Sequence, residues 1–316
     1  MMKLLVTRPL PDAVLANLVE FELTVRSETH PLSHDELVGA LRGYDAVLPT
    51  LGDAFSADVI GQVSAPRCKI LANFGVGYNH IDTAAAKAAG ILVTNTPGAV
   101  TDATADIAMT LMLMSARRAG EGERLVRSGD WEGWHPTQML GLHLSGKTVG
   151  IAGMGRIGQA IARRCHFGFG MRVKYFNRSA KKLDFPAEKV ASLSDMARQV
   201  DVLVVAVPAN PDTKHMIDAD VLSAMQSHAR LINIARGDIV NETALIAALD
   251  ANQIGGAGLD VYEFEPHVPE ALRRLENVVL LPHLGTSALE VRVDMGRMAA
   301  ENLQAFRAGQ TPPNVV

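Results

Sequence analysis

The chain has few cysteines and no long hydrophobic run, and each shortage excludes a class of protein. Its 316 residues include two cysteines, Cys68 and Cys165, which fit neither a disulfide framework nor a zinc site. We expect both to be buried, small apolar side chains and predict no metal. The longest apolar stretch, Ile107 to Met114, is far shorter than a membrane span, and the apolar start, Met1 to Val6, is too short for a signal-peptide core. These features predict a cytoplasmic protein without membrane contact.

Positive charge is also scarce. The chain has 30 Lys and Arg against 34 Asp and Glu, a formal net charge of −4. Because nucleic-acid binding needs a basic face, this balance argues against a nucleic-acid partner. An apolar content of 48% with 20% charged residues is typical of a globular enzyme, and the length fits two ordinary domains.

Short apolar runs alternate with helical patterns throughout, which predicts βαβ units and parallel sheets. The predicted strands are Lys3–Thr7, Ala46–Pro49, Lys69–Ala72, Ile91–Thr94, Thr148–Ala152, Met171–Phe176, Val202–Val207, Leu231–Ile234, Gly256–Leu259 and Val278–Leu281. One long helix is predicted over Thr101–Arg118, with Thr101 or Asp102 as its N-cap, and another follows Asn241 as cap. Residues 98–286 would form one domain, and residues 1–97 with the returning C-terminal helix, 287–316, the other.

A glycine-rich motif, Gly153-Met154-Gly155-Arg156-Ile157-Gly158, directly follows the predicted strand Thr148–Ala152. Its first glycine permits a tight strand-to-helix turn, the second lets backbone approach a pyrophosphate, and the third allows close packing of helix on strand. The following helix would direct free N–H groups at the phosphates. A lone motif is weak evidence, but here it lies between two strands at βαβ distance, which favours dinucleotide binding over a structural turn.

The end of the next strand indicates which dinucleotide binds. An NAD-binding unit usually places Asp or Glu about 20 residues beyond the glycines, on the ribose 2′-hydroxyl. This chain has Asn177-Arg178-Ser179 there and no carboxylate. Arg178 can bind a 2′-phosphate through its guanidinium fork, and Ser179 can donate a further hydrogen bond. The sequence therefore favours NADP(H), with NAD(H) possible, although a solvated basic turn is the simpler account of Lys181 and Lys182.

Three residues after predicted strands suit hydride transfer to a carbonyl: Arg236, Glu265 and His283. That chemistry needs a cation for a carboxylate or carbonyl, a proton donor, and a group that keeps the donor protonated. The carboxyl ends of parallel strands, where ligands bind in open α/β sheets, would bring all three together. Taken singly, each would more often be a salt-bridge partner, a turn carboxylate or a structural histidine.

Together these segments resemble the D-2-hydroxyacid dehydrogenase family, and most of all its glyoxylate/hydroxypyruvate reductase branch. The resemblance runs end to end and includes Asn73-Phe74-Gly75-Val76-Gly77-Tyr78-Asn79, Thr101-Asp102-Ala103-Thr104-Ala105-Asp106, the glycine motif and the Arg236, Glu265 and His283 segments. It implies an α/β fold: a Rossmann-type doubly wound parallel sheet plus a second, flavodoxin-like α/β lobe, with a cleft between them. It also implies a homodimer.

The resemblance also implies roles for individual residues. Arg236 would bind the substrate carboxylate and carbonyl, and His283 would be the general acid in reduction, held in its protonated form by Glu265. Cofactor contacts are implied for Thr104, for the loop beginning at Pro208, and for Asp260, the last near the nicotinamide carboxamide.

On the substrate side, the resemblance implies that the amides around Val76 and Gly77 hold the carboxylate beside Gly75. The family usually has a smaller or β-branched residue where this chain has Asn73-Phe74, so Phe74 is expected to reshape the pocket. Leu51 is a further pocket candidate. Trp134 lies in a segment similar to one at the family's subunit interface, although simple packing also accounts for it.

The resulting prediction is NADPH-dependent reduction of glyoxylate or hydroxypyruvate to the D-2-hydroxy acid. Another 2-oxo acid reductase of the family, such as one for hydroxyphenylpyruvate, is the nearest alternative; the 2′-phosphate signature disfavours phosphite and formate enzymes. A nucleotide-sensing, dehydrogenase-like corepressor is the alternative from another class. A short-chain dehydrogenase is excluded because the chain has no Tyr-x-x-x-Lys.

Overall fold

Two parallel sheets organise the chain, which a computed structural model describes over residues 1–316. Contacts divide it into one unit of Met1–Val100 with Ser287–Val316 and a second of Thr101–Thr286. No helix is both long and apolar enough to span a membrane.

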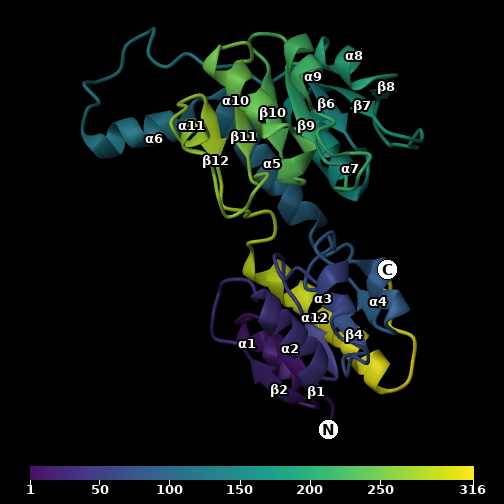
Figure 1. The fold of residues 1–316 in the computed structure, drawn as a ribbon. Helices are drawn as coiled ribbons and strands as arrows, with labels where there is room; N and C mark the ends of the chain where they lie inside the picture. The colour runs from purple at the N-terminus through teal and green to yellow at the C-terminus, as the bar shows by residue number, and fades with distance from the viewer. The chain divides into compact units, whose positions relative to one another are not determined.

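The first unit contains a five-stranded parallel sheet of order β2-β1-β3-β4-β5 (Figure 1). Its strands are β1 (Lys3–Val6), β2 (Glu22–Val25), β3 (Ala46–Leu48), β4 (Ile70–Ala72) and β5 (Leu92–Thr94). Its helical segments are α1 (Asp12–Leu15), η1 (Ala16–Leu18), α2 (His34–Gly43), α3 (Ala57–Gly61), α4 (Thr83–Ala88) and α12 (Leu289–Arg307). The edge strand β2 was not predicted. Three of its four residues are exposed and only Leu23 is partly buried, so the sequence shows no apolar run there.

The C-terminal helix α12 packs into this first unit. A Cβ at Gly296 would meet Val14 Cγ2 at 2.3 Å, so α12 and α1 approach closely only because Gly296 lacks a side chain. Buried Asn302 donates to the carbonyl of Asn95 and accepts from the amide of Asn314. The chain end then pairs with β5 through Thr94 and Val315.

The second unit contains a seven-stranded parallel sheet of order β12-β11-β10-β9-β6-β7-β8. Its strands are β6 (Thr148–Ala152), β7 (Arg172–Phe176), β8 (Ala187–Lys189), β9 (Val202–Val205), β10 (Arg230–Asn233), β11 (Gly256–Leu259) and β12 (Val278–Leu280). Its helical segments are α5 (Thr101–Ala116), α6 (Ala119–Ser128), α7 (Arg156–Arg163), η2 (Arg164–Gly168), α8 (Leu193–Ala197), α9 (Ala219–Ala224), η3 (Gly237–Ile239), α10 (Glu242–Asp250) and α11 (Glu270–Arg273).

Both faces of this sheet are covered, which explains the unbroken apolar runs of its strands. Alternate residues point to opposite faces: Val202 and Val204 pack in the cluster beneath α5 and α7, whereas Leu203 and Val205 pack with α8, α9 and α10. The predicted doubly wound α/β architecture is therefore confirmed.

The predicted helix over Thr101–Arg118 begins at Thr101 as predicted but ends two residues early, at Ala116, and its predicted N-cap is wrong. Thr101 and Asp102 already lie in the first turn of α5, and Asp102 accepts a hydrogen bond from Arg164 instead of capping. At the other end Arg118 adopts a left-handed backbone (φ 53°), which stops α5 and starts a separate helix, α6. The predicted cap Asn241 does accept from the amide of Ala244, at 3.0 Å. Cys68 and Cys165 are buried and unpaired, as expected.

Candidate active site at the carboxyl edge of the seven-stranded sheet

Apart from Thr104, which lies in α5, the predicted cofactor and catalytic residues of the second unit follow the carboxyl ends of its parallel strands. Since such ends share one sheet edge, segments distant in sequence come together there. The glycine motif follows β6, Asn177-Arg178-Ser179 follow β7, Pro208 follows β9, Arg236 follows β10, Asp260 and Glu265 follow β11, and His283 follows β12. The sheet thus brings together the nucleotide motif and the three candidate catalytic residues.

The glycine loop has the packing that a dinucleotide site requires. A Cβ on Gly153, whose φ is +99°, would meet the carbonyl oxygen of Ala206 at 2.6 Å, and one on Gly158 would meet the carbonyl oxygen of Gly153 at 2.0 Å. Gly155, by contrast, has no atom within 4 Å of its Cβ position, so its face is open. No side chain caps α7, the helix that starts at Arg156. Its first-turn N–H groups therefore lie beside an open glycine, where phosphates bind.

The turn after β7 is tied to this loop by Asn177. Its side-chain oxygen accepts from the amide of Met154 at 3.2 Å, and its amide donates to the carbonyl of Ser179 at 2.9 Å. Arg178 and Ser179 are exposed, and the segment 177–179 carries no carboxylate. A cation therefore lies where NAD-specific units usually hold an acid.

His283 and Glu265 form a hydrogen-bonded pair, with Nδ1 of His283 2.9 Å from Oε2 of Glu265. The other oxygen, Oε1, accepts from the amide of Tyr262 at 3.0 Å, and the Tyr262 hydroxyl donates to the carbonyl of Leu281 at 2.8 Å. Burial alone would raise the pKa of Glu265, but the hydrogen bonds and charge of His283, the Tyr262 amide and the charge of Arg236 outweigh it and lower the pKa. The carboxylate is therefore held ionised beside the imidazole.

Asp260 fixes the turn that contains His283. Its buried carboxylate accepts from the amides of Leu284 and Gly285 at 2.6 and 2.8 Å, and its carbonyl accepts from the amide of His283 at 3.0 Å. These bonds hold His283 in a left-handed backbone conformation (φ 53°), which non-glycine residues seldom adopt without such support. Burial raises the pKa of Asp260 against these hydrogen bonds and the charge of His283.

Arg236 lies in a turn that packs directly on the segment carrying Glu265. A Cβ on the next residue, Gly237, would be 1.8 Å from the carbonyl carbon of Tyr262, so only glycine allows this approach. Asn233 holds the turn by donating to the carbonyl of Arg236 at 2.8 Å and accepting from the amide of Ala235. Burial lowers the pKa of Arg236, and the charges of Glu265 and Asp238 oppose that shift.

The remaining cofactor candidates are Thr104 and Pro208. Thr104 is buried in the first turns of α5, and its hydroxyl donates to the carbonyl of Gly285 at 3.1 Å, so it joins α5 to the His283 turn. Pro208 is exposed, and its carbonyl accepts from the hydroxyl of Thr213 at 2.8 Å.

The substrate candidates Leu51, Phe74, Gly75, Val76 and Gly77 all lie in the first unit, after β3 and β4. Asn73 shapes their loop: its amide nitrogen donates to the carbonyls of Gly75 and Gly77, both at 3.0 Å, and its oxygen lies 3.0 Å from Nε2 of His80. Phe74 is buried, whereas Val76 is exposed. The buried side chain of Phe74 therefore supports this loop from the interior of the first unit.

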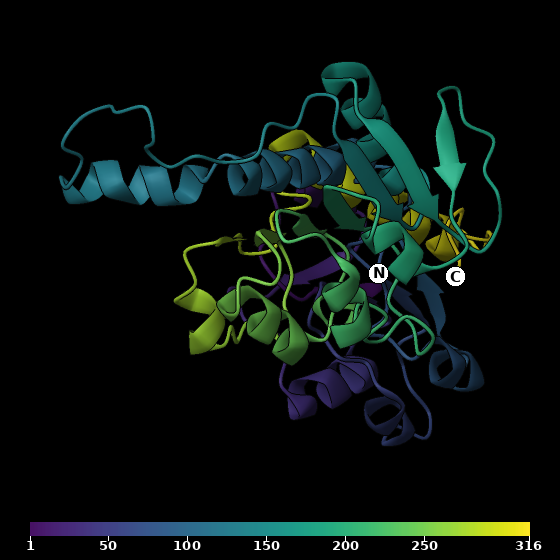
Figure 2. The ribbon, with the colours of Figure 1, turned by 90° about the horizontal axis from the view of Figure 1, so that it is seen from above.

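Trp134 belongs neither to the residues at the carboxyl edge of the seven-stranded sheet nor to the Gly75–Gly77 loop; it lies in the segment after α6. This helix and the following loop extend away from the seven-stranded sheet (Figure 2). No residue of α6 is buried, and Trp134 is 79% exposed. The arm formed by residues 119–141 also exposes Val126, Trp131 and Leu140.

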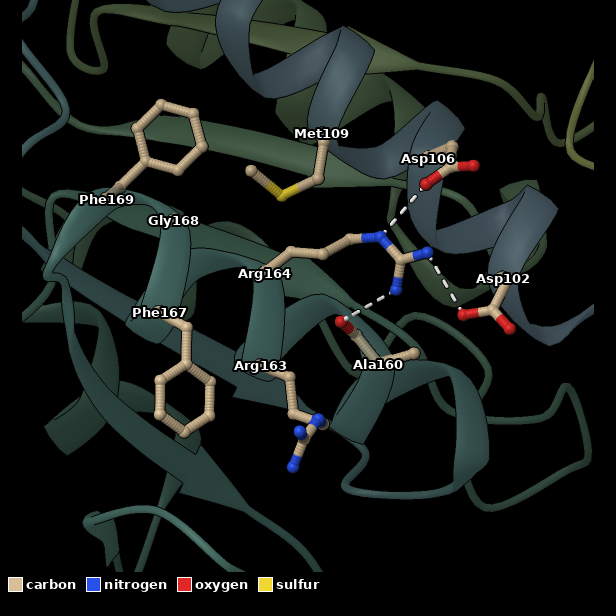
Figure 3. Close-up of a pocket in the computed structure, with 9 residues that line it drawn as sticks. All are labelled: Asp102, Asp106, Met109, Ala160, Arg163, Arg164, Phe167, Gly168 and Phe169. Carbon is tan, nitrogen blue, oxygen red and sulfur yellow. Dashed lines mark hydrogen bonds and ion pairs between the residues drawn. The ribbon is translucent and has the colours of Figure 1, made fainter.

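A cavity of about 590 Å³ lies elsewhere on the second unit, between α5, α7 and η2. Figure 3 shows Arg164 turned toward Asp102 and Asp106: it donates to both carboxylates and to the carbonyl of Ala160. Arg163 pairs with Asp184. The hydrogen bonds of Arg164 join the helical segment after the glycine loop to α5. The cavity therefore lies beside a structural contact between helices and offers no group for hydride chemistry.

Sequence reasoning missed Tyr262, Asn233 and Asn73, which hold Glu265, Arg236 and the Gly75–Gly77 loop. Each lies within four residues in the sequence of a residue that it positions. A polar or aromatic side chain close in sequence to a candidate site residue was therefore the signal that could have found them. The bonded atoms belong mostly to the backbone, which sequence does not reveal.

Comparison with known proteins identifies the family of this chain. A sequence model of the D-isomer specific 2-hydroxyacid dehydrogenase NAD-binding domain matches residues 109–285. The chain belongs to the D-isomer specific 2-hydroxyacid dehydrogenase family.

A glyoxylate reductase from Thermococcus kodakarensis is 44% identical over 99% of this chain and 96% of that protein. A solved protein from Thermus thermophilus superposes with a TM-score of 0.92 at 41% identity, covering all of both chains. An NADPH-dependent glyoxylate/hydroxypyruvate reductase from Sinorhizobium meliloti, solved with NADP and malonate, has a TM-score of 0.88 at 36% identity over 100% of this chain and 96% of that one.

Proposed function

We propose that this 2-hydroxyacid dehydrogenase reduces a small 2-oxo acid, glyoxylate or hydroxypyruvate, to the D-2-hydroxy acid with NADPH. The observation that carries the proposal is the 2.9 Å pair of His283 with Glu265, at the same sheet edge as Arg236 and the glycine loop. The names of the Thermococcus and Sinorhizobium relatives support the substrate class.

The residues at this edge fit a dinucleotide. The amides of Gly155, Arg156 and Ile157 would bind the pyrophosphate, because Gly155 is open and α7 is uncapped. Met154, whose amide donates to Asn177, would hold the loop against the cofactor. Asn177, Arg178 and Ser179 would hold the adenosine ribose and its 2′-phosphate. Thr104, Pro208 and Asp260 complete the proposed contacts. When bound, the nicotinamide supplies the hydride that C2 of the substrate receives.

His283 would deliver the proton. With Nδ1 turned to Glu265, the ring presents Nε2 to the substrate oxygen, and the ionised carboxylate stabilises the imidazolium until the proton leaves. Arg236 would bind the carboxylate and polarise the carbonyl, since its positive charge acts on Glu265 of this pair. In the reverse direction His283 would accept the proton from the 2-hydroxyl.

The Gly75–Gly77 loop would bind the substrate carboxylate through its backbone. The amides of Val76 and Gly77 donate no hydrogen bond within the chain, and Asn73 ties down the carbonyls of the loop. Leu51 would border the substrate, and Phe74 would act through the loop that it supports.

A homodimer is proposed from the arm at residues 119–141. The exposed amphipathic helix α6 and the two exposed tryptophans of the loop after it leave apolar surface that a second copy would cover, with Trp134 bordering the partner's substrate pocket. Sedimentation of the wild-type protein and of Trp134→Ala tests this: we expect a dimer for the first and a shift toward monomer for the second. A monomeric wild type would overturn the dimer.

A panel of 2-oxo acids assayed with NADPH and NADH in parallel tests the function. The proposal predicts the highest kcat/KM with glyoxylate or hydroxypyruvate and NADPH. Higher values with hydroxyphenylpyruvate would assign a different substrate in the same family. Binding of NADPH without oxidation by any 2-oxo acid would favour a nucleotide-sensing protein.

A further inference from the structure

A second cavity, of about 270 Å³, lies at the opposite edge of the seven-stranded sheet from His283. Arg230 and Val278, the first residues of β10 and β12, line it together with Ser115 at the end of α5 and Gly120 at the start of α6. Because the strands are parallel, their amino ends lie away from the proposed cofactor and catalytic residues. The cavity is therefore separate from that site.

Arg230 is a buried cation without an acidic partner. Its residue is 9% exposed, and its guanidinium donates only to carbonyl oxygens, from Nε to Ser115 at 3.3 Å and from Nη1 to His228 at 3.0 Å. Buried charges are normally paired, because an unpaired one loses its hydration without replacement. Nη2 donates to no atom of the chain.

The cavity is built around this guanidinium. A Cβ on Gly255 would lie 1.7 Å from Nη1 of Arg230, so that glycine vacates the space that the guanidinium fills. The two carboxylates that line the cavity are each matched by another arginine: Glu121 accepts from Arg118 at 2.6 Å, and Glu276 pairs with Arg124. Neither neutralises Arg230.

Further hydrogen-bond donors face the same space. The hydroxyl of Ser115, a residue only 6% exposed, is buried without a hydrogen-bond partner. Helix α6 starts here with Gly120 in its first turn, and no side chain caps it. The cavity therefore combines a guanidinium, a hydroxyl and first-turn N–H groups, all of which are donors to an anion.

We propose that this cavity binds a phosphate-class oxyanion, either free phosphate or a small phosphate monoester. The Arg230 guanidinium donates to one oxygen of the oxyanion through Nη2. The Ser115 hydroxyl and the backbone N–H groups in the first turn of α6 donate to its other oxygens. The anion supplies the negative charge that Arg230 lacks. This site is independent of the 2-oxo acid reduction proposed above.

Calorimetric titration of the full-length protein with inorganic phosphate, at constant ionic strength set by chloride, tests the proposal. We expect one phosphate per chain, bound at least about tenfold more weakly by Arg230→Gln, which loses a charge-assisted contact. Arg273→Gln, at an exposed arginine of α11, is the matched control and leaves the affinity unchanged. Arg178→Ala also leaves it unchanged, which separates this site from the proposed 2′-phosphate site.

Ser115→Ala keeps the test decisive if Arg230→Gln folds poorly. Because the buried Ser115 hydroxyl has no hydrogen-bond partner in the protein, its removal does not lower the unfolding midpoint in chloride but weakens phosphate binding about fivefold. Tighter binding of glycerol 2-phosphate than of phosphate would identify a monoester as the ligand, and equal or weaker binding would identify the free ion.

Two outcomes overturn the proposal. The first is the absence of saturable binding of either phosphate compound to the wild type; if Arg230→Gln then also changes the oligomeric state, the cavity is part of a subunit interface. The second is unchanged phosphate affinity in both Arg230→Gln and Ser115→Ala.

Discussion

Nδ1 of His283 and Oε2 of Glu265 lie 2.9 Å apart, across the loops that follow two adjacent parallel strands, β12 and β11. Because Oε1 of Glu265 accepts from the Tyr262 amide, the carboxylate is held at both oxygens. The ring orientation of His283 is thereby set before any substrate arrives, which leaves Nε2 for proton transfer.

Substitution of Gly237 tests whether this pair and Arg236 act as one unit. In Gly237→Ala the new Cβ would lie 1.8 Å from the carbonyl carbon of Tyr262, so the turns of Arg236 and Glu265 must separate. A displacement of about 1 Å at a reacting group lowers the rate about 100-fold, and we expect at least that loss in kcat/KM. Gly39→Ala, in helix α2 with no atom within 4 Å of the new Cβ, is the control and should keep normal activity. Equal activity of both variants would show that the close approach is dispensable.

The lowered pKa of Glu265 predicts a pH dependence of stability. A carboxyl whose pKa is lower in the folded than in the unfolded state stabilises the fold above the unfolded value, about 4.3, and this contribution disappears as the pH falls through the folded pKa. The wild type should therefore lose its stability advantage over Glu265→Gln as the pH falls from 6 toward about 3. Urea midpoints at several pH values measure this, with Glu132→Gln, at an exposed residue, as control. A constant difference between wild type and Glu265→Gln would contradict the pKa assignment.

Cofactor preference is tested at Arg178. Loss of a charge-assisted contact to the 2′-phosphate is expected to raise the KM for NADPH about tenfold or more in Arg178→Ala. The KM for NADH should stay within about twofold, because NADH carries no 2′-phosphate. Arg198→Ala, which removes an exposed arginine paired with Asp195, should change neither value. Parallel rises for both cofactors in Arg178→Ala would show that Arg178 does not select NADPH.

Much of the fold could be predicted because the central strands of both sheets are short apolar runs bounded by turn residues. Gly256–Leu259 has the predicted bounds, and most other strands differ by one or two residues at an end. The edge strands β2 and β8 were missed because they are short and largely exposed. The end of α5 was missed because the left-handed backbone of Arg118, not a glycine or proline, stops it.

For the site, sequence reasoning identified the residues with functional groups but not what holds them. Arg236, Glu265 and His283 each follow a strand, so the parallel topology alone predicts that they lie at the carboxyl edge of the sheet. The anchors of His283 and Arg236 are backbone bonds from Asp260 and Asn233, together with the close approach of Gly237 to Tyr262. The bonds of Asp260 and the approach of Gly237 to Tyr262 depend on packing between loops that are distant in the chain, whereas the bond from Asn233 to Arg236 is local. The unpaired charge of Arg230 is likewise evident only when its surroundings are known.

The most direct test of the proposed function is the kcat for glyoxylate reduction by NADPH in His283→Ala. His228→Ala is the matched control, because His228 also pairs with a carboxylate, Asp201 at 2.7 Å, but precedes β10 at the opposite sheet edge. The account predicts that His283→Ala lowers kcat about 10²–10⁴-fold while NADPH affinity changes little, and that His228→Ala stays near wild type. A kcat for His283→Ala close to that of the wild type would contradict the assignment of His283 as the proton donor.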